Sequence, residues 1–318
     1  MSFSSEVREE LTKDSPKSLH CRIAMLAGIV TLDGKRKEED GKQFLSIRME
    51  QDELVDAAKR LFIQIFGFRE EDMVILPRSS GGARLRIEDE EKLNRVVQTL
   101  KLRVHRETED PRNRTEDRYD VDEMVFSRLC CRSAYLKGAF LAAGSVSNPE
   151  VSYQLEIVSG RETVTKQLMK IIEGFGLSAK TTERRGQDVI YMKGAEVISE
   201  LLGQIGAGSA MMELENVRIL KGIRNNVNRE VNCDTANIAK ITKAAQNSLA
   251  DIRLIEERQG LGSLPAELCE IAVLRRDNPE LSLTELGELL TPPLGKSGVN
   301  HRLRKLREIA GRDPADPV

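Results

Sequence analysis

The pattern of hydrophobic positions predicts the same order of strand and helix twice along the chain. In the first half, alternating apolar residues in Leu45–Met49 predict a strand, and helical apolar spacing in Asp52–Phe66 predicts a helix. In the second half, Tyr153–Ile157 alternates in the same way and Arg161–Ile172 is helix-like. The repeated order indicates an internally duplicated domain.

Each half continues with similar features. A glycine-containing phrase follows the predicted helix, IFGF at Ile65–Phe68 and GFGL at Gly174–Leu177. A hairpin and a closing helix come next in both halves. The predicted strands are Met73–Leu76 and Ala83–Ile87, joined by a turn at Ser79–Gly82, and Ser178–Thr182 and Val189–Met192, joined through Gly186; the closing helices are Glu90–Leu102 and Ala195–Ile205.

A short motif precedes each of these units. Leu26–Gly34 reads LAGIVTLDG and Leu136–Gly144 reads LKGAFLAAG, so the motif recurs at about the same offset as the units that follow it. Both copies resemble the paired motif of LAGLIDADG homing endonucleases, in which two such helices pack face to face and their final acidic residues hold metal ions at the scissile phosphates. The resemblance implies an α+β protein in which two αβαββα units form a saddle.

The two motif copies agree in their small residues and differ in their acidic residue. The small residues expected at the helix seam are Ala24, Ala27 and Gly28 in the first copy and Gly138, Ala139 and Ala142 in the second. At the acidic position the first copy has Asp33, whereas the second has Ala143. Because two-metal phosphodiester chemistry needs carboxylates on both sides of the reacting phosphate, we predict poor or absent cleavage. The saddle is then free to bind nucleic acid or a protein partner.

The carboxyl-terminal part of the chain has the pattern of a helix-turn-helix. Pro265–Arg275 predicts one helix, and Ser282 with Glu285 makes a capping box for a second helix that runs to Leu290. A third helix, capped by Ser297, carries its apolar stripe at Val299, Leu303, Leu306 and Ala310. Its opposite side presents Ser297, Asn300, His301, Arg304 and Lys305, as readout of the DNA major groove requires. The turn before this helix is longer than usual.

Basic residues are concentrated in two segments although the formal net charge of the whole chain is −2. The first segment, Lys296–Arg312, has a net charge of +5, and the second, Arg218–Lys243, has +4. The second segment is predicted to be a helical linker interrupted around Val231–Thr235. Twelve residues are candidates for contacts with DNA: Lys296, Ser297, Asn300, His301, Arg302, Arg304, Lys305, Arg307, Arg218, Lys221, Arg224 and Arg229.

Cysteine and histidine spacing predicts neither a metal site nor a cofactor. The five cysteines form no C-x-x-C pair, which indicates neither a disulfide framework nor a zinc site. They are Cys21, Cys130, Cys131, Cys233 and Cys269. Because His20, His105 and His301 are scattered along the chain, a histidine metal cluster is not expected either.

The composition is typical of a soluble multidomain protein. The 318 residues allow two or three domains at about 100–200 residues each, and 40% hydrophobic with 31% charged residues is ordinary. No apolar run approaches the roughly 20 residues of a membrane span. The initial MSFSSEVREELTKD lacks an apolar signal core. We therefore expect a cytoplasmic protein with no membrane partner.

Three parts of the chain together resemble one family. They are the two motif helices, RNNVNREVNCDTANIAKITKAA at Arg224–Ala245, and GKSGVNHRLRKLREIA at Gly295–Ala310. They are similar to the bacterial WhiA family of sporulation regulators, whose members join a degenerate LAGLIDADG domain to a C-terminal helix-turn-helix. The resemblance implies a sequence-specific transcriptional regulator that acts on double-stranded DNA in the nucleoid and is not an enzyme. It also implies a role in sporulation, cell division or chromosome segregation, and a small iron–sulfur transcriptional regulator as a partner.

Domain boundaries and function hypotheses follow from these patterns. The expected parts are a first LAGLIDADG-like half at 1–104, a charged, exposed linker at 105–123, a second half at 124–214, a basic helical linker at 215–258, and a helix-turn-helix domain at 259–318. A DNA-binding regulator is the favoured function, a nucleoid-associated or cell-division scaffold is the alternative, and an active endonuclease is the third hypothesis. Ala143 argues against the endonuclease. Asp33 keeps the acidic residue of the nuclease motif, unlike the degenerate domain that the family resemblance implies, and leaves residual metal binding open.

Overall fold

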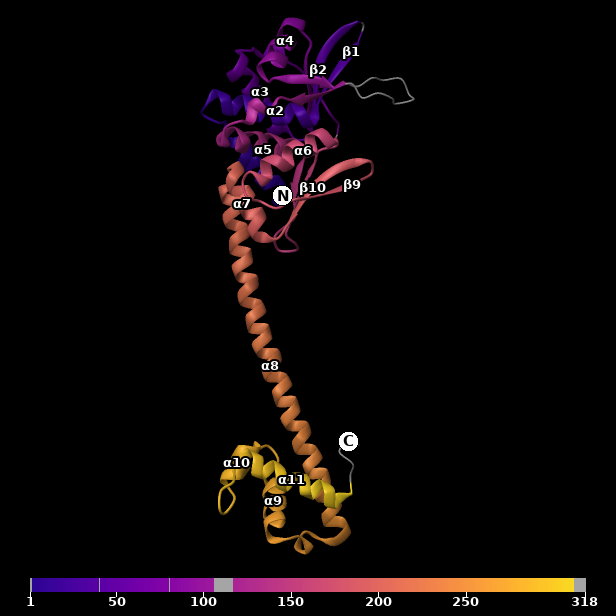
Figure 1. Cartoon of the computed structure of the whole chain (residues 1–318), viewed down its shortest axis with the longest axis vertical. Helices are drawn as coiled ribbons and strands as arrows, with labels where there is room; N and C mark the ends of the chain where they lie inside the picture. The colour runs from indigo at the N-terminus through magenta and orange to yellow at the C-terminus, as the bar shows by residue number, and fades with distance from the viewer. Residues whose placement is uncertain (1, 40, 80, 106–116, 312–318) are drawn as a thin grey trace. The chain divides into compact units, whose positions relative to one another are not determined.

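The chain divides into two units, Met1–Lys221 and Gly222–Val318 (Figure 1). The computed structural model describes residues 2–39, 41–79, 81–105 and 117–311. Parts of three predicted features lie outside these ranges: Ser80 of the hairpin turn, residues 106–116 of the charged linker, and Arg312 of the basic segment. Among the helices described, none is both long enough and apolar enough to cross a membrane.

The first unit contains the duplicated domain. Its first half comprises α1 Phe3–Lys13, α2 Leu19–Asp33, β1 Gly34–Glu39, β2 Lys42–Met49, α3 Asp52–Phe66, η1 Glu70–Asp72, β3 Val74–Pro77, β4 Ala83–Ile87, α4 Glu90–Thr99, β5 Leu102–His105, β6 Asp117–Val121 and η2 Glu123–Phe126. Its second half comprises α5 Leu129–Ala143, β7 Gly144–Val146, β8 Gln154–Val158, α6 Glu162–Glu173, β9 Lys180–Arg184, β10 Gln187–Lys193 and α7 Ala195–Ile205.

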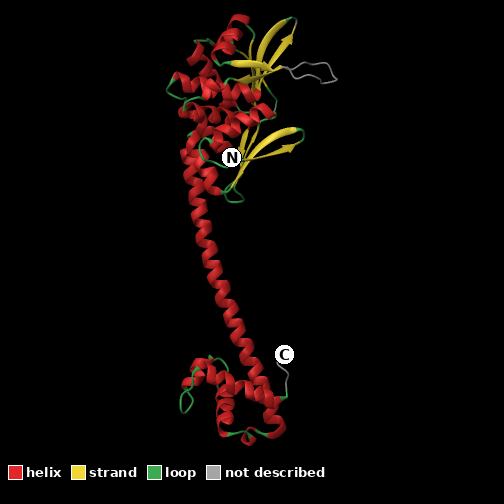
Figure 2. Ribbon diagram, in the orientation of Figure 1, coloured by secondary structure: helices red, strands yellow, loops and turns green. Residues whose placement is uncertain are grey.

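The two halves form sheets that share the order of four strands. The first sheet has the order β3-β4-β2-β1-β6-β5, and the second has β7-β8-β10-β9, with every pair antiparallel. Reading the second sheet from β9 reproduces the first four strands of the first sheet. In Figure 2 the strands of both sheets project to the same side of the first unit. The topology confirms the predicted α+β, LAGLIDADG-like duplication.

The first half has two further unpredicted strands, β5 and β6, and each half has one unpredicted strand within the repeated unit, which is therefore αββαββα. The unpredicted strands of the repeated unit, β1 and β7, directly follow the two motif helices. The sequence of β1, GKRKEE, is almost entirely charged, and β7 is only GSV, so neither shows the alternation that marks a strand. Backbone pairing with β2 and β8 forms these strands without it.

The predicted charged linker also contributes to the fold. Its end, Asp117–Val121, is strand β6, which pairs with β1 and β5, so this part is not an exposed loop. Arg161, the N-cap residue of α6 in the second half, contacts this strand. Its guanidinium donates hydrogen bonds to the backbone oxygens of Thr31 and Tyr119 and pairs with Asp120 at 2.8 Å. Burial of this cation therefore connects the second half to both α2 and β6.

The motif helices α2 and α5 form the seam between the halves. Their glycines pack backbone against backbone: a Cβ on Gly28 would lie 2.4 Å from the backbone oxygen of Tyr135, and one on Gly138 would lie 2.0 Å from that of Met25. Residues 24–32 of α2 are all buried, so the helix is surrounded by protein. The predicted seam of small residues is confirmed for these glycines.

The second unit is helical. Its elements are the larger part of α8 Gly208–Gln259, η3 Leu261–Ser263, α9 Ala266–Asp277, α10 Leu283–Glu288 and α11 Lys296–Ala310. α8 continues through Val231–Thr235, where an interruption was expected. The capping box of Ser282 and Glu285 is present, whereas the N-cap of α11 is Gly295 rather than Ser297. The predicted apolar stripe of α11 is buried.

The seam predicts opposite effects for two glycine substitutions. Gly138→Ala should destabilise the first unit by about 1–3 kcal/mol or more, because the added Cβ must displace the backbone of α2. Gly222→Ala in α8 has open space around it and should be neutral or stabilising by up to about 1 kcal/mol through helix propensity. Thermal unfolding of both variants measures the difference; a wild-type transition for Gly138→Ala would show that the seam tolerates separation.

Candidate nucleic-acid interface

The carboxyl ends of the two motif helices carry the positions that correspond to nuclease acids. Asp33 ends α2 and is half-buried, and Ala143 ends α5. Burial raises the pKa of Asp33 to about 7, and the nearby charge of Glu50 adds to this, while Arg48, Arg118 and Arg8 oppose it. The raised pKa favours the protonated carboxyl group, which is a weaker metal ligand than a carboxylate.

An arginine from outside the motifs reaches the same end of the seam. Arg8 of α1 donates a hydrogen bond to the backbone oxygen of Gly144, the residue after Ala143, and its charge acts on Asp33 and Glu50. Helix α1 was not predicted, because its apolar residues Phe3, Val7 and Leu11 are few in a polar segment. The chain thus supplies its own cation at the point where the second carboxylate is missing.

The raised pKa of Asp33 predicts a pH-dependent stability. The folded-state pKa of Asp33 lies above the unfolded value of about 4. Below pH 4 the group is protonated in both states, so it does not change the free energy of unfolding. Between pH 4 and pH 7 the free energy of unfolding falls progressively, and above pH 7 the loss is complete. Asp33→Asn should therefore stabilise the first unit by roughly 1–3 kcal/mol at pH 8 and have little effect at pH 4. Unfolding titrations across this range, with the exposed Asp56→Asn as control, measure the profile; a gain independent of pH would contradict the assignment.

Helix α11 presents a polar face to solvent. Six of the predicted DNA-contacting residues on it are exposed: Lys296, Ser297, Asn300, His301, Arg304 and Lys305. Arg304 makes an i,i+4 pair with Glu308 at 3.5 Å, and its side chain is 76% exposed. These groups are available to a ligand in solution.

The other two predicted contacts on α11 are engaged within the second unit. Arg302 lies between Glu267 and Glu270 of α9, at 3.4 and 3.7 Å, and its side chain is only 14% exposed. Arg307 pairs with the buried Asp251 of α8 at 3.3 Å. The apolar stripe of α11 therefore has an ion pair on each flank, and both pairs fix the rotation of the helix about its axis.

A groove runs beside the polar face of α11. It has a volume of about 440 Å³ and lies between α8, α10 and α11. Lys296, Asn300 and Arg304 line it from α11, and Lys240 and Ser248 line it from α8. Lys240 belongs to the basic segment Arg218–Lys243 but is not among the twelve predicted DNA contacts. Its place in the groove depends on how α8 packs against α11, which the sequence pattern does not reveal.

The four basic candidates on α8 divide between the units. Arg218 pairs with Glu215 at 2.9 Å, and the Lys221 ammonium donates to the backbone oxygen of Pro149 at 2.7 Å while lying over the ring of Tyr153. Both lysine contacts are with the first unit. Arg224 and Arg229 are exposed in the second unit.

The first sheet has a basic face that sequence analysis missed. The strand register places a set of basic residues opposite the core face of Leu45 and Ile47, including Lys35, Lys37, Arg48, Arg84, Arg86, Arg103 and Arg118. Arg86 lies 4.6 Å from the ring centroid of Phe44 and pairs with Glu39 at 3.2 Å. Alternating basic residues in GKRKEE and ARLRI were the available signal.

One histidine and three cysteines lie together in space, whereas the sequence spacing predicts no such cluster. His20 and Cys21 begin α2, Cys130 and Cys131 begin α5, and their donor atoms all lie within 4.8 Å of one another. Sequence spacing missed this cluster because its halves are distant in the chain and meet only through the packing of the two motif helices. Cys233 and Cys269 are free thiols elsewhere, and His301 is on α11.

Comparison with known proteins identifies the family. Residues 132–224 match the WhiA LAGLIDADG-like domain, and residues 227–310 match the WhiA C-terminal HTH domain. A probable cell division protein WhiA from Heliobacterium modesticaldum is 41% identical, over 98% of this chain and 96% of that protein. The chain belongs to the WhiA family. A probable cell division protein WhiA from Lachnospira eligens is 40% identical, again over 98% of this chain and 96% of the relative.

A solved structure shows the same fold. The crystal structure of full-length DUF199/WhiA from Thermatoga maritima is similar with a TM-score of 0.54 and 23% identity, and the match covers 99% of this chain and 100% of that one. This likeness confirms the predicted organisation of the WhiA chain into a LAGLIDADG-like domain, a long helical region and a helical C-terminal domain.

Proposed function

We propose that the chain is a sequence-specific, DNA-binding regulator in which α11 reads the major groove. The observation that carries this proposal is the division of α11 into a buried apolar stripe and an exposed polar face. A helix held in this way can enter the groove with its polar face, while the rest of the unit stays folded behind it. The match to the WhiA C-terminal HTH domain supports it.

We assign different roles to the residues of α11. Asn300 and Arg304 have side chains that can form bidentate hydrogen bonds with adenine and guanine, so they are proposed to read base edges. Lys296, Ser297, His301 and Lys305 are proposed to contact phosphates or bases beside them. Arg302 and Arg307 are proposed to orient the helix through their ion pairs with α9 and α8, in place of the DNA contacts expected from sequence.

Contacts outside α11 are proposed to supply affinity without sequence preference. Arg224 and Arg229 are exposed on α8, and Lys240 lines the groove beside α11. Neutralising phosphates releases counterions, so such contacts strengthen binding to any duplex and make it salt-dependent. Arg218 and Lys221 are proposed as further phosphate contacts, although each already has a partner.

Substitutions should separate the two classes of contact. Asn300→Ala and Arg304→Ala are expected to reduce the preference for target over random duplex by roughly 1–3 kcal/mol. Arg224→Ala and Arg229→Ala should weaken binding to both duplexes, and each should lower the salt slope by about 0.9 because one phosphate is no longer neutralised. Footprinting of the full chain on genomic fragments identifies the target, and fluorescence anisotropy at several salt concentrations measures the affinities.

Arg276→Ala, on α9 and outside the groove, is the matched control and should bind as the unaltered chain does. Equal losses on target and random duplex for Asn300→Ala and Arg304→Ala would show that α11 is oriented differently. Uniform coverage of all fragments, with no discrete protected sites, would favour the nucleoid-associated or cell-division scaffold over the regulator.

The LAGLIDADG-like domain is proposed not to cleave DNA. One acid, Asp33, remains at the seam, burial raises its pKa, and Arg8 brings a cation to the position beside Ala143. A guanidinium there competes with a metal ion electrostatically. The relatives are named as cell division proteins, which agrees with a role other than cleavage.

Incubation with Mg²⁺ or Mn²⁺ is expected to leave DNA that contains the protected sites intact. Two-metal hydrolysis lacks its second carboxylate at Ala143, so neither strand should be cut. Gel analysis of supercoiled plasmid detects a single nick per molecule. Metal-dependent cutting that Asp33→Ala abolishes would restore the endonuclease hypothesis.

We further propose that regulation by this chain acts on sporulation, cell division or chromosome segregation in the nucleoid. The names of the relatives support cell division among these processes. The small iron–sulfur regulator that the family resemblance implies as a partner stays a prediction.

A further inference from the structure

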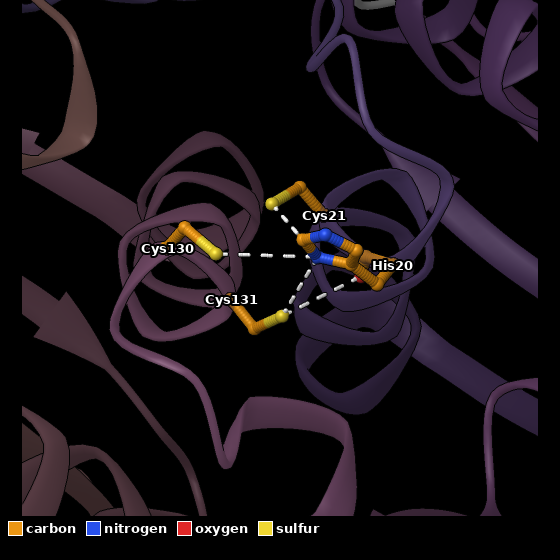
Figure 3. A group of neighbouring side chains, drawn as sticks. All are labelled: His20, Cys21, Cys130 and Cys131. Atoms are coloured by element: carbon orange, nitrogen blue, oxygen red, sulfur yellow. Dashed lines mark hydrogen bonds between the residues drawn. The ribbon is translucent and has the colours of Figure 1, made fainter.

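Four soft or borderline metal donors meet at the amino-terminal ends of the two motif helices. The imidazole Nδ1 of His20 lies 3.2 Å from Sγ of Cys21, 3.2 Å from Sγ of Cys131 and 4.0 Å from Sγ of Cys130 (Figure 3). All four donor atoms lie within 4.8 Å of one another. Cys21 and Cys131 are buried, His20 is half-buried, and Cys130 is exposed, so the cluster lies at the surface end of the seam.

The duplication accounts for this arrangement. His20 and Cys130 occupy equivalent positions in the two halves, as do Cys21 and Cys131, because both pairs have the same sequence separation as the two motif copies. His20 and Cys21 lie in the first turn of α2, after its N-cap Ser18. Cys130 and Cys131 lie in the first turn of α5, after its N-cap Arg128. The close packing of α2 on α5 therefore brings two donors from each helix to one point.

The geometry fits one ion better than a larger cofactor. Tetrahedral zinc with Zn–S bonds of about 2.3 Å requires donor atoms roughly 4 Å apart, which is close to the separation seen. Three cysteines and one histidine form a known set for structural zinc, and four protein ligands close the coordination shell. A cluster of several irons would need its thiolates spread around a larger core.

We propose that His20, Cys21, Cys130 and Cys131 bind one Zn²⁺ ion that joins α2 to α5 at the amino-terminal end of the seam. The ion would cross-link the two halves of the duplicated domain at the end opposite to Asp33 and Ala143. Its role is structural, because all four coordination positions belong to the protein. Without a cation, burial raises the pKa of the Cys21 thiol to about 12, with the neighbouring thiols adding to the effect; zinc would displace these protons.

Metal content and cobalt spectroscopy test the site in the intact chain. The untagged full-length protein is purified under reducing conditions, stripped with a chelator and loaded with Zn²⁺, and its metal content is measured by mass spectrometry after gel filtration. One zinc per chain is expected. Co²⁺ in place of zinc should give the thiolate-to-metal charge-transfer band and the intense visible bands of tetrahedral coordination, and Zn²⁺ should abolish both.

Variants locate the ion. Cys130 is exposed, so Cys130→Ser leaves the core intact and should weaken zinc binding at least tenfold in competition with a chromophoric chelator. His20→Ala should do the same. Cys269→Ser and Cys233→Ser are the matched controls and should bind as the unaltered chain does. Zinc should also raise the unfolding temperature of the first unit in the unaltered chain and in both controls, but not in Cys130→Ser.

Several results would overturn the proposal. They are a chain that retains no zinc under reducing conditions, a Co²⁺ spectrum without thiolate bands, and equal zinc affinity in Cys130→Ser and Cys269→Ser. A disulfide among Cys21, Cys130 and Cys131 that persists in reductant and excludes zinc would also overturn it and assign the cluster to redox chemistry. Circular dichroism of each variant establishes that a loss of binding is not a loss of fold.

Discussion

Close packing of α2 against α5 determines how the first unit is built. Gly28 and Gly138 let the two backbones meet, and any side chain at either position would push the helices apart. Because the helices pack along their length and each sits at the same place in its half, equivalent residues of the two halves are brought side by side at both ends of the seam. Van der Waals contact between backbones therefore decides which side chains become neighbours.

The two ends of this seam have different chemistry as a result. At the carboxyl end, one half-buried acid, Asp33, meets the guanidinium of Arg8, and the second motif contributes the methyl group of Ala143. At the amino end, three thiols and the imidazole of His20 converge. The carboxyl end lacks the second carboxylate that two-metal chemistry requires. The amino end has two potential metal donors from each helix, at equivalent positions.

The second unit depends on a different constraint, the rotation of α11 about its own axis. The apolar stripe buries one side of the helix, but a stripe alone still allows a small rotation of the helix about its axis. Arg302 with the α9 glutamates and Arg307 with Asp251 restrict it from both flanks. Such pairs add little net stability, yet they select one orientation and so determine which residues reach the groove.

The sequence by itself determined the elements whose pattern is strong: the duplicated halves, the apolar stripe of α11 and the capping box at Ser282. Helical spacing and capping depend on residues only a few positions apart, so the sequence shows them directly. It could not show strands such as β1, whose charged residues are ordered by backbone pairing with β2. Only the tertiary structure engaged Arg302 and Arg307 in ion pairs and brought His20 beside Cys131. These contacts join segments far apart in the chain, and a linear pattern carries no information about which distant residues packing will place together.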